Sequence, residues 1–354
     1  MKVMLFHLIL LSLVGVVFSA NSTESTDLNS IKASKEVSVS GVSSGGAMAG
    51  QMIVAYSSKI KGAGIFAAPP YFCTKGAAIS VIDCMTTGVS VFSDQLVLAA
   101  KGFEKLGQID SLSNMKNKKI YMFSGKRDSI VWSGVVKKNE EFFRKLGANI
   151  ETEYSLSAEH TFPTDFFGNS CGKLGKPFIN NCDFKGSKHA LEHIVGQSLN
   201  PKVDYKEENL KSFNQKKYQI GFKHSLDNSG MIYVPDGCKN KACELHVAFH
   251  GCEQTTKDIG LDYVYGTGFL GLAEANDFIV LFPQVKKSIF GGNPQGCWDW
   301  WGYSETIPTP LQWVFPTQSG VQMRAIDNMI SDLQSGSFEL HSEFAFKDIP
   351  KSSY

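Results

Sequence analysis

A glycine-rich turn between a strand pattern and a helix pattern limits the folds open to this chain. Residues 36–40 form a short strand pattern, residues 41–46 are Gly-Val-Ser-Ser-Gly-Gly, and residues 47–57 form a helix pattern of small side chains. Glycines at 41 and 45 permit a sharp turn that raises the Ser43 hydroxyl above the sheet. We therefore expect a sheet with a serine exposed at the end of one strand.

Strand and helix patterns alternate along most of the remaining chain. Strands are predicted at 64–68, 119–123, 149–156, 230–234, 245–250 and 278–283, and helices at 91–106, 134–146, 266–276 and 321–334. This alternation predicts the α/β class, a mostly parallel sheet with helices on both faces. Residues 161–200 interrupt it, with only one helix pattern at 188–195, and we interpret them as an excursion beside the sheet. No repeat or linker is evident, so 36–354 is expected to be a single domain.

The N-terminal residues predict entry into the secretory pathway. Lys2 precedes a mostly apolar run over 3–17 that ends in Ser19 and Ala20, which is typical of a signal peptide over 1–20. A membrane anchor is the alternative, but the run is shorter than the roughly 20 residues needed to span a bilayer. Residues 21–35 are polar, with a glycosylation sequon at Asn21, and predict a flexible mature N-terminus. We expect a secreted, extracellular protein, with a lysosome-like compartment as an open alternative.

The charge balance argues against polyanionic partners. The chain has 35 basic and 34 acidic residues, and removal of the predicted signal peptide takes away one lysine. A neutral chain has no overall attraction to nucleic acid or to an anionic membrane surface. We therefore expect no nucleic-acid partner. The short apolar run predicts no stable membrane insertion, and the protein is expected to be a monomer.

Eight cysteines remain after removal of the signal peptide, and they indicate disulfides. An even number in an oxidising compartment favours four disulfides, although 105 pairings are possible. Zinc is the alternative, but no C-x-x-C pair or histidine-rich spacing is present, so no metal site is predicted. Proximity in sequence favours Cys73 with Cys84, Cys171 with Cys182, Cys238 with Cys243, and Cys252 with Cys297.

Two polar residues after later strands could activate Ser43. A serine hydroxyl is unreactive at neutral pH unless a histidine accepts its proton and a carboxylate orients that histidine. Asp128 follows the strand at 119–123, and His160 follows the strand at 149–156. The order serine, aspartate, histidine is that of α/β-hydrolases. The alternatives are that Asp128 pairs with a basic side chain or caps a helix, and that His160 is a surface loop residue.

A candidate oxyanion hole requires a rearranged chain order. One donor would be the N–H of Ser44, and a His-Gly pair after an early strand normally marks the loop of the second. Here the match is His250-Gly251-Cys252, which follows Ser43 in sequence instead of preceding it. A circular permutation, in which the helix at 321–334 would lead into the strand at 36–40, restores the usual order. A chance turn at 250–252 is the alternative.

Taken together, these motifs resemble those of single-domain, circularly permuted, fungal-type polyhydroxybutyrate depolymerases. The resemblance covers nearly the whole mature chain and rests on 41–46, 125–128, 158–160, 250–252 and 293–298. It implies a triad of Ser43, Asp128 and His160, an oxyanion hole from the amides of Ser44 and Cys252, and no cofactor. It also implies that a Cys252–Cys297 disulfide lies beside the site and that Asn293 and Trp298 line substrate subsites.

The sequence indicates the type of reaction more clearly than the substrate. Trp298, Trp300 and Trp301 suggest an apolar wall or a platform for a water-insoluble polyester, although buried core positions are the alternative, and we expect Trp298 in the cleft. No separate polymer-binding module is evident. A secreted esterase of the feruloyl or acetylxylan type would share the same motifs. A non-catalytic secreted binding protein on the same fold is a further alternative.

Overall fold

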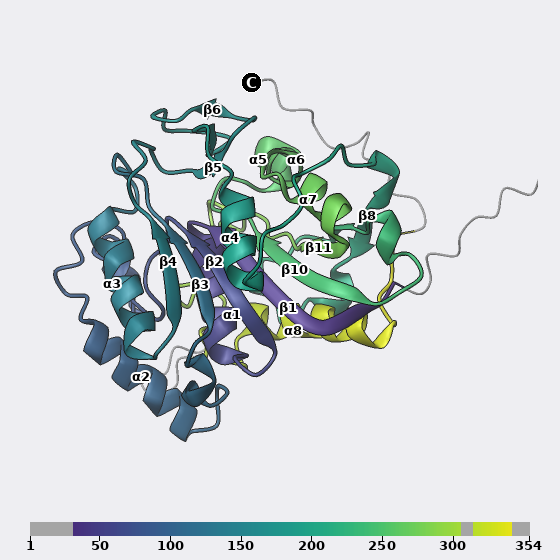
Figure 1. Cartoon of the computed structure of the whole chain (residues 1–354). Helices are drawn as coiled ribbons and strands as arrows, with labels where there is room; N and C mark the ends of the chain where they lie inside the picture. Colours follow the sequence, from purple (N-terminus) through teal and green to yellow (C-terminus); the bar gives the residue numbers. More distant parts are fainter. Residues whose placement is uncertain (1–30, 306–313, 342–354) are drawn as a thin grey trace, which may run out of the picture.

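The computed structural model describes residues 31–305 and 314–341, so the predicted signal peptide and residues 21–30 lie outside the described residues (Figure 1). Its main sheet has eight strands in the order β4-β3-β2-β1-β10-β11-β9-β8. All neighbours from β4 to β11 are parallel, whereas β9 is antiparallel to both β11 and β8. The strands are β1 Ala33–Val42, β2 Ile60–Phe66, β3 Lys119–Phe123, β4 Asn149–Glu153, β8 Leu210–Asn214, β9 Ser229–Tyr233, β10 Cys243–Phe249 and β11 Phe278–Phe282.

Helices cover both faces of this sheet, as expected. The helices are α1 Ser44–Ala55, α2 Ser93–Lys105, α3 Ser133–Lys145, α4 Gly186–Val195, α5 Thr256–Ile259, α6 Asp262–Gly266, α7 Phe269–Asn276 and α8 Val321–Ser335. Alternate residues of β3 show the two layers: Ile120 and Met122 join the core with α1, α2, α3 and α8, and Tyr121 and Phe123 join the core with α4, α6 and α7. The prediction of a mostly parallel α/β sheet with helices on both faces is confirmed.

The excursion after β4 forms a small sheet of its own. Its strands are β5 Phe162–Thr164, β6 Asn169–Ser170 and β7 Ile179–Asn181, in the order β5-β7-β6, and it lies above the main sheet in Figure 1. The helix predicted at 266–276 is α7, which begins at Phe269 because Gly268 before it adopts a left-handed conformation with φ of 82°, and the short helix α6 that precedes it was not predicted. The strand β8 was not predicted.

The centre of the sheet joins the two halves of the chain. β1 pairs with β2 on one side and with β10 on the other, so β1 to β4 build one half of the sheet and β8 to β11 build the other (Figure 1). The side chain of His246 on β10 bridges Ser38 and Ser40 on β1, with Nδ1–Oγ and Nε2–Oγ distances of 2.8 and 2.7 Å. The helix α8 packs in the core beside β1, but the circular permutation itself stays a prediction.

All eight cysteines are paired, in the four disulfides that proximity favoured. They are Cys73–Cys84, Cys171–Cys182, Cys238–Cys243 and Cys252–Cys297. Within the described residues, no helix is both long enough and apolar enough to cross a bilayer. Nor do His, Cys, Asp and Glu side chains gather anywhere in 31–305 or 314–341 in a group that could hold a metal ion.

Candidate active site

Ser43 occupies a sharp turn between β1 and α1. Its backbone has φ of 58° and ψ of −124°, a conformation that an L residue adopts only when its surroundings enforce it. The Ser43 N–H donates to the Phe66 carbonyl oxygen at 2.8 Å, and the Ser43 carbonyl oxygen accepts from the Ala47 N–H at 3.0 Å. The turn is therefore held on one side by β2 and on the other by the first turn of α1.

The two glycines of this turn allow it to approach β10 closely. A Cβ on Gly45 would lie 2.2 Å from the carbonyl oxygen of Phe249, and a Cβ on Gly41 would lie 2.3 Å from the carbonyl oxygen of Gly45. Real Cβ atoms do not approach backbone oxygens so closely, so only glycine fits at either position. The Gly-x-Ser-x-Gly spacing is thus explained by packing against the end of β10 as well as by the turn itself.

Asp128 and His160 meet beyond the carboxyl ends of β3 and β4. The His160 Nδ1 lies 2.9 Å from Asp128 Oδ2 and 3.1 Å from Asp128 Oδ1, and both side chains are buried. The backbone N–H groups of Ile130 and Val131 donate to Asp128 Oδ1 at 3.0 and 2.8 Å. Because Nδ1 is held by the carboxylate, Nε2 is the ring nitrogen with which His160 can accept a proton.

The loops that carry this pair are joined to each other. The Glu159 Oε2 accepts hydrogen bonds from the Ser129 N–H and hydroxyl, both at 3.1 Å, and from the His160 N–H at 2.9 Å. The Arg127 N–H also donates to the Ala158 carbonyl oxygen at 2.9 Å. These contacts hold the loop after β3 against the loop after β4, and so maintain the geometry of the Asp128–His160 pair.

Ser43 and His160 line the same cavity, whose volume is about 210 Å³. The cavity also contains Ser44 and Cys252, the residues expected to form the oxyanion hole. Most of its other lining is apolar, from Val42, Pro69, Met85, Ile130, Val131, Phe178 and Trp300. The structure therefore brings Ser43 and His160 to one largely apolar cavity at the carboxyl edge of the parallel strands, with Asp128 behind His160 and outside the cavity lining.

The first candidate oxyanion donor belongs to the start of α1. Ser44 is the first residue of this helix, and the first four N–H groups of a helix have no partner within it. The helix dipole adds partial positive charge at this end. The N–H of Ser44 is thus suited to stabilise negative charge that develops beside Ser43.

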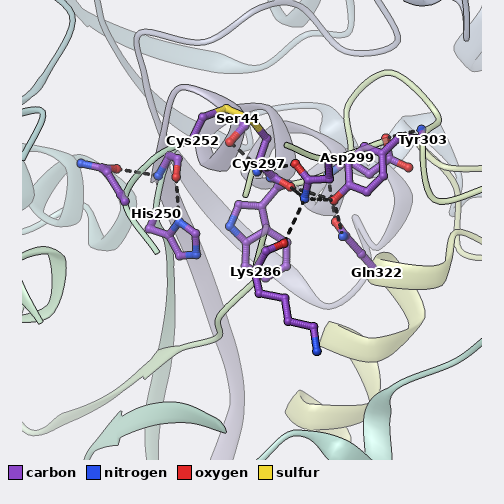
Figure 2. Close-up of a disulfide and its surroundings, with 12 residues drawn as sticks. Ser44, His250, Cys252, Lys286, Cys297, Asp299, Tyr303 and Gln322 are labelled. Carbon is purple, nitrogen blue, oxygen red and sulfur yellow. Dashed lines mark hydrogen bonds between the residues drawn. A yellow bond between two sulfur atoms is a disulfide. The ribbon is translucent and has the colours of Figure 1, made fainter. Parts of the chain in front are cut away.

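The second candidate donor lies in the oxyanion loop, residues 250–252. The His250 Nδ1 lies 2.7 Å from the Gly251 carbonyl oxygen (Figure 2). On the other side of the ring, the Val285 N–H donates to His250 Nε2 at 3.3 Å. A neutral ring with its proton on Nδ1 satisfies both contacts, and burial lowers the pKa of His250 to about 4. Since C=O and N–H point in opposite directions in a trans peptide, this contact turns the Cys252 N–H away from His250.

The disulfide behind the cavity ties the oxyanion loop to a second loop. Cys252 and Cys297 are joined with their Cα atoms 4.2 Å apart (Figure 2). Asn293 braces the second loop, the one that carries Cys297. Its Oδ1 accepts from the Cys297 N–H at 2.8 Å, and its Nδ2 donates to the Cys297 carbonyl oxygen at 3.0 Å. Asn293 is fully buried and does not line the cavity, so the structure places it as a support rather than at the expected subsite.

The tryptophans are arranged differently from the expectation. Trp298 is fully buried, packs against Phe249 and His250 with ring centroids 5.1 and 5.9 Å apart, and does not line the cavity. Trp300 lines the cavity instead. The intervening Asp299 is buried, which raises the pKa of its carboxyl group. It accepts hydrogen bonds from the backbone N–H groups of 301–304, so the turn that directs these side chains depends on Asp299.

Other cavity residues were not predicted from the sequence. Phe178 comes from the excursion, and its ring lies 6.2 Å from the His160 ring, edge to face. Met85 and Ile130 flank the cavity from the connections before α2 and α3, and Gln254 follows the oxyanion loop. The residue Gln254 could have been suspected only from its closeness in sequence to His250-Gly251-Cys252.

A strand–serine–helix turn at the carboxyl edge of a mostly parallel sheet, with an Asp–His pair after later strands, defines the α/β-hydrolase fold class. Comparison with known proteins identifies the family within that class. The chain is 36% identical over 321 residues to a polyhydroxybutyrate depolymerase of Talaromyces funiculosus, with 85% of this chain and 90% of the relative covered. The chain belongs to the polyhydroxybutyrate depolymerase family, whose members are carboxylic ester hydrolases.

Further comparisons agree with this assignment. A poly(3-hydroxybutyrate) depolymerase of Delftia acidovorans is 34% identical over 310 residues, which span 85% of this chain but 60% of that longer relative. The crystal structure of a PHB depolymerase from Penicillium funiculosum matches with a TM-score of 0.75 and 32% identity, covering 87% of this chain and 98% of the other. A serine-to-alanine variant of a PHB depolymerase complexed with an R3HB trimer matches equally well. No protein-family model matches the chain.

Proposed function

We propose that this protein is a secreted serine esterase that hydrolyses poly(3-hydroxybutyrate), or its hydroxyalkanoate oligomers, through an acyl-enzyme on Ser43. The observation that carries the proposal is that Ser43 and the hydrogen-bonded Asp128–His160 pair come together at one apolar cavity. Membership of the depolymerase family supports the substrate class. Secretion is supported by the four disulfides and the predicted signal peptide.

The proposed cycle needs only groups of this chain and water. The Ser43 Oγ attacks the ester carbonyl carbon while its proton passes to His160 Nε2, and Asp128 stabilises the imidazolium. The oxyanion accepts hydrogen bonds from the N–H groups of Ser44 and Cys252. Collapse breaks the ester bond, and His160 returns the proton to the leaving alcohol. Water then attacks the acyl-enzyme with the same histidine as base, which releases the acid and restores Ser43.

Exposed apolar side chains on the connection between β2 and α2 support an insoluble substrate. Ile79, Ile82 and Val89 are 90, 71 and 76% exposed, and they lie on the same segment of chain as Met85, which lines the cavity. Exposed apolar side chains that gather in one patch mark contact surfaces. A polyester particle is a partner that such a surface fits.

The decisive experiment compares two substrates and two serine variants. We expect the wild type to clear an amorphous poly(3-hydroxybutyrate) suspension and to cleave p-nitrophenyl butyrate. Ser43→Ala should lose both activities, with turnover reduced on the order of a millionfold. The control Ser335→Ala alters an exposed serine at the end of α8 and should match the wild type. Retained ester cleavage by Ser43→Ala would falsify the proposed mechanism.

The same assay separates polyester from other esters. If the protein cleaves p-nitrophenyl butyrate but neither clears the suspension nor cleaves hydroxybutyrate oligomers, it is a serine esterase but the proposed substrate is contradicted. Feruloylated and acetylated sugars would then be the next substrates to test, because an esterase of that type would use the same catalytic residues.

A further inference from the structure

We propose that Gln254 is a positioning residue that fixes the oxyanion loop, residues 250–252, against the backbone of Pro177 and of Phe178, which lines the cavity. This inference rests on the proposed function, because it concerns the N–H of Cys252 as an oxyanion donor. Gln254 is 2% exposed, and nothing in the proposed cycle requires it to touch the substrate.

The side-chain amide of Gln254 is fully engaged with backbone groups. Its Oε1 accepts from the Gly251 N–H at 2.6 Å. Its Nε2 donates to the carbonyl oxygen of Pro177 at 2.7 Å and to that of Phe178 at 3.4 Å. One side chain thus connects the loop after β10 to the excursion after β4, at the point where Phe178 packs against His160.

The need for such a connection follows from Gly251. A Cβ at this position would lie 2.9 Å from Gln254 Oε1 and 3.2 Å from the Cβ of Ser43, so the close approach of the loop to Ser43 favours glycine. Glycine is also the residue whose backbone rotates most freely. The residue that allows the approach therefore leaves the direction of the next N–H, that of Cys252, weakly determined.

Gln254 and His250 remove this freedom from opposite sides. Gln254 holds the N–H of Gly251, and therefore the peptide between His250 and Gly251. His250 holds the carbonyl oxygen of Gly251, and therefore the peptide between Gly251 and Cys252. With both peptide planes fixed, the Cys252 N–H keeps one direction before substrate arrives, which is the preorganisation that an oxyanion hole requires.

Glutamine suits this position because it is uncharged and carries both a donor and an acceptor at its end. Methionine has a similar length but can neither hold the Gly251 N–H nor donate to the two carbonyl oxygens. An ionised glutamate can accept from Gly251 but presents a negative charge to the carbonyl oxygens of Pro177 and Phe178. Once protonated, the same glutamic acid can donate a hydrogen bond and take over both tasks.

The first test is Gln254→Met assayed on p-nitrophenyl butyrate. We expect kcat to fall about 10- to 100-fold, below the loss measured when an oxyanion donor is deleted outright, with KM changed less than about threefold. The control is Gln318→Met, whose side-chain amide likewise donates to a backbone carbonyl oxygen, that of Ala55, at the end of α1; neither residue lines the cavity. It should change kcat less than about twofold. Wild-type kcat in Gln254→Met would overturn the inference, as would an equal loss in the control.

The second test is the pH dependence of Gln254→Glu, which still reports if the methionine variant does not fold. Burial raises the pKa of a carboxyl group, so we expect the ratio of variant kcat to wild-type kcat to rise about tenfold as pH falls from 8 to 5.5. Dividing by the wild-type kcat at each pH removes the pH dependence that the two proteins share. A ratio that stays constant or declines contradicts the inference. Ser43→Ala separates the two proposals, because its activity decides the nucleophile whatever Gln254 does.

Discussion

Two buried histidines, one within β10 and one directly after it, have both ring nitrogens in hydrogen bonds. His246 bridges Ser38 and Ser40, and His250 lies between the Gly251 carbonyl oxygen and the Val285 N–H. Burial lowers the pKa of His246 to about 3 and that of His250 to about 4. Both are therefore neutral in the folded protein at every pH where an esterase of this kind would act.

This neutrality predicts an acid-sensitive stability. An unfolded histidine has a pKa of about 6.5, so below that pH the unfolded state binds protons that the folded state refuses. The free energy of unfolding should fall as pH falls from about 6.5 to about 4, by about 1.4 kcal/mol per pH unit for each histidine. Urea unfolding at pH 7.5, 5.5 and 4.5 measures this dependence.

The matched variant is His246→Gln, which keeps hydrogen-bonding groups between Ser38 and Ser40 but cannot be protonated. Its stability should be lower than that of the wild type at pH 7.5 but less dependent on pH. The comparison must be made against the wild type, because Glu305, whose pKa burial raises to about 7, contributes in the opposite direction over this range. If the free energy of unfolding of His246→Gln depends on pH as steeply as that of the wild type, His246 does not cause the acid sensitivity.

At the scale of elements, the turn from β1 to α1 allows a paired glycine test. Gly45→Ala should reduce ester hydrolysis by about 100-fold or more, because its Cβ would collide with the Phe249 carbonyl oxygen and displace Ser43. Gly50→Ala lies in the same helix, where a Cβ would meet only ordinary contacts at 3.6 and 3.7 Å. It should raise stability by about 0.5 to 1 kcal/mol with normal activity. Thermal unfolding and p-nitrophenyl butyrate hydrolysis measure both effects.

The disulfides allow a second paired test at this scale. Loop-closure entropy assigns about 4 kcal/mol to Cys252–Cys297, which closes a separation of 45 residues, and about 2 kcal/mol to Cys238–Cys243, which closes 5. Double serine variants of each pair should lose stability in that order. Only the Cys252/Cys297 variant should also lose kcat, because that bond restrains the oxyanion loop. Equal kcat in the two variants would argue against this restraint.

At the scale of the whole molecule, the exposed apolar side chains between β2 and α2 predict that attachment to polymer particles can be weakened without loss of ester hydrolysis. Ile79→Ser combined with Ile82→Ser should weaken attachment to polymer particles by about tenfold or more, from the apolar area lost. Cleavage of p-nitrophenyl butyrate should be unchanged, because neither residue lines the cavity. Phe222→Ser, 76% exposed on the connection before β9, is the control. Equal polymer clearing by all these proteins would count against an adsorption surface at Ile79 and Ile82.

The main sheet could be predicted because its signals are local. Apolar runs such as 119–123 and 278–283 are buried on both faces, and the glycine turn at 41–46 is required by its own packing. The exceptions have tertiary causes. The helix predicted at 266–276 begins only at Phe269, after the left-handed Gly268, and the small sheet of the excursion has strands too short to produce a pattern.

The site was predictable where side chains lie on the loops that follow strands. Asp128 and His160 lie on the loops after β3 and β4, so the parallel pairing of these two strands brings them together. Trp298 and Asn293 were expected to line the cavity, but neither does. The direction of a side chain in a turn depends on the hydrogen bonds that fix the turn, and these cannot be predicted from the sequence. Here Asp299 fixes the turn so that Trp300, rather than Trp298, reaches the cavity. Phe178 was not predicted because it reaches the site from the excursion.

The pairing of β1 with β10 has a consequence for synthesis on the ribosome. Ser38 and His246, which face each other across this pair, are 208 residues apart. At 5 to 20 residues per second, a nascent chain would expose one edge of β1 for roughly 10 to 40 s before its neighbour emerged. An apolar strand with an open edge is a template for aggregation. Chaperone binding during translation should therefore concentrate on the first half of the chain and end when β10 emerges.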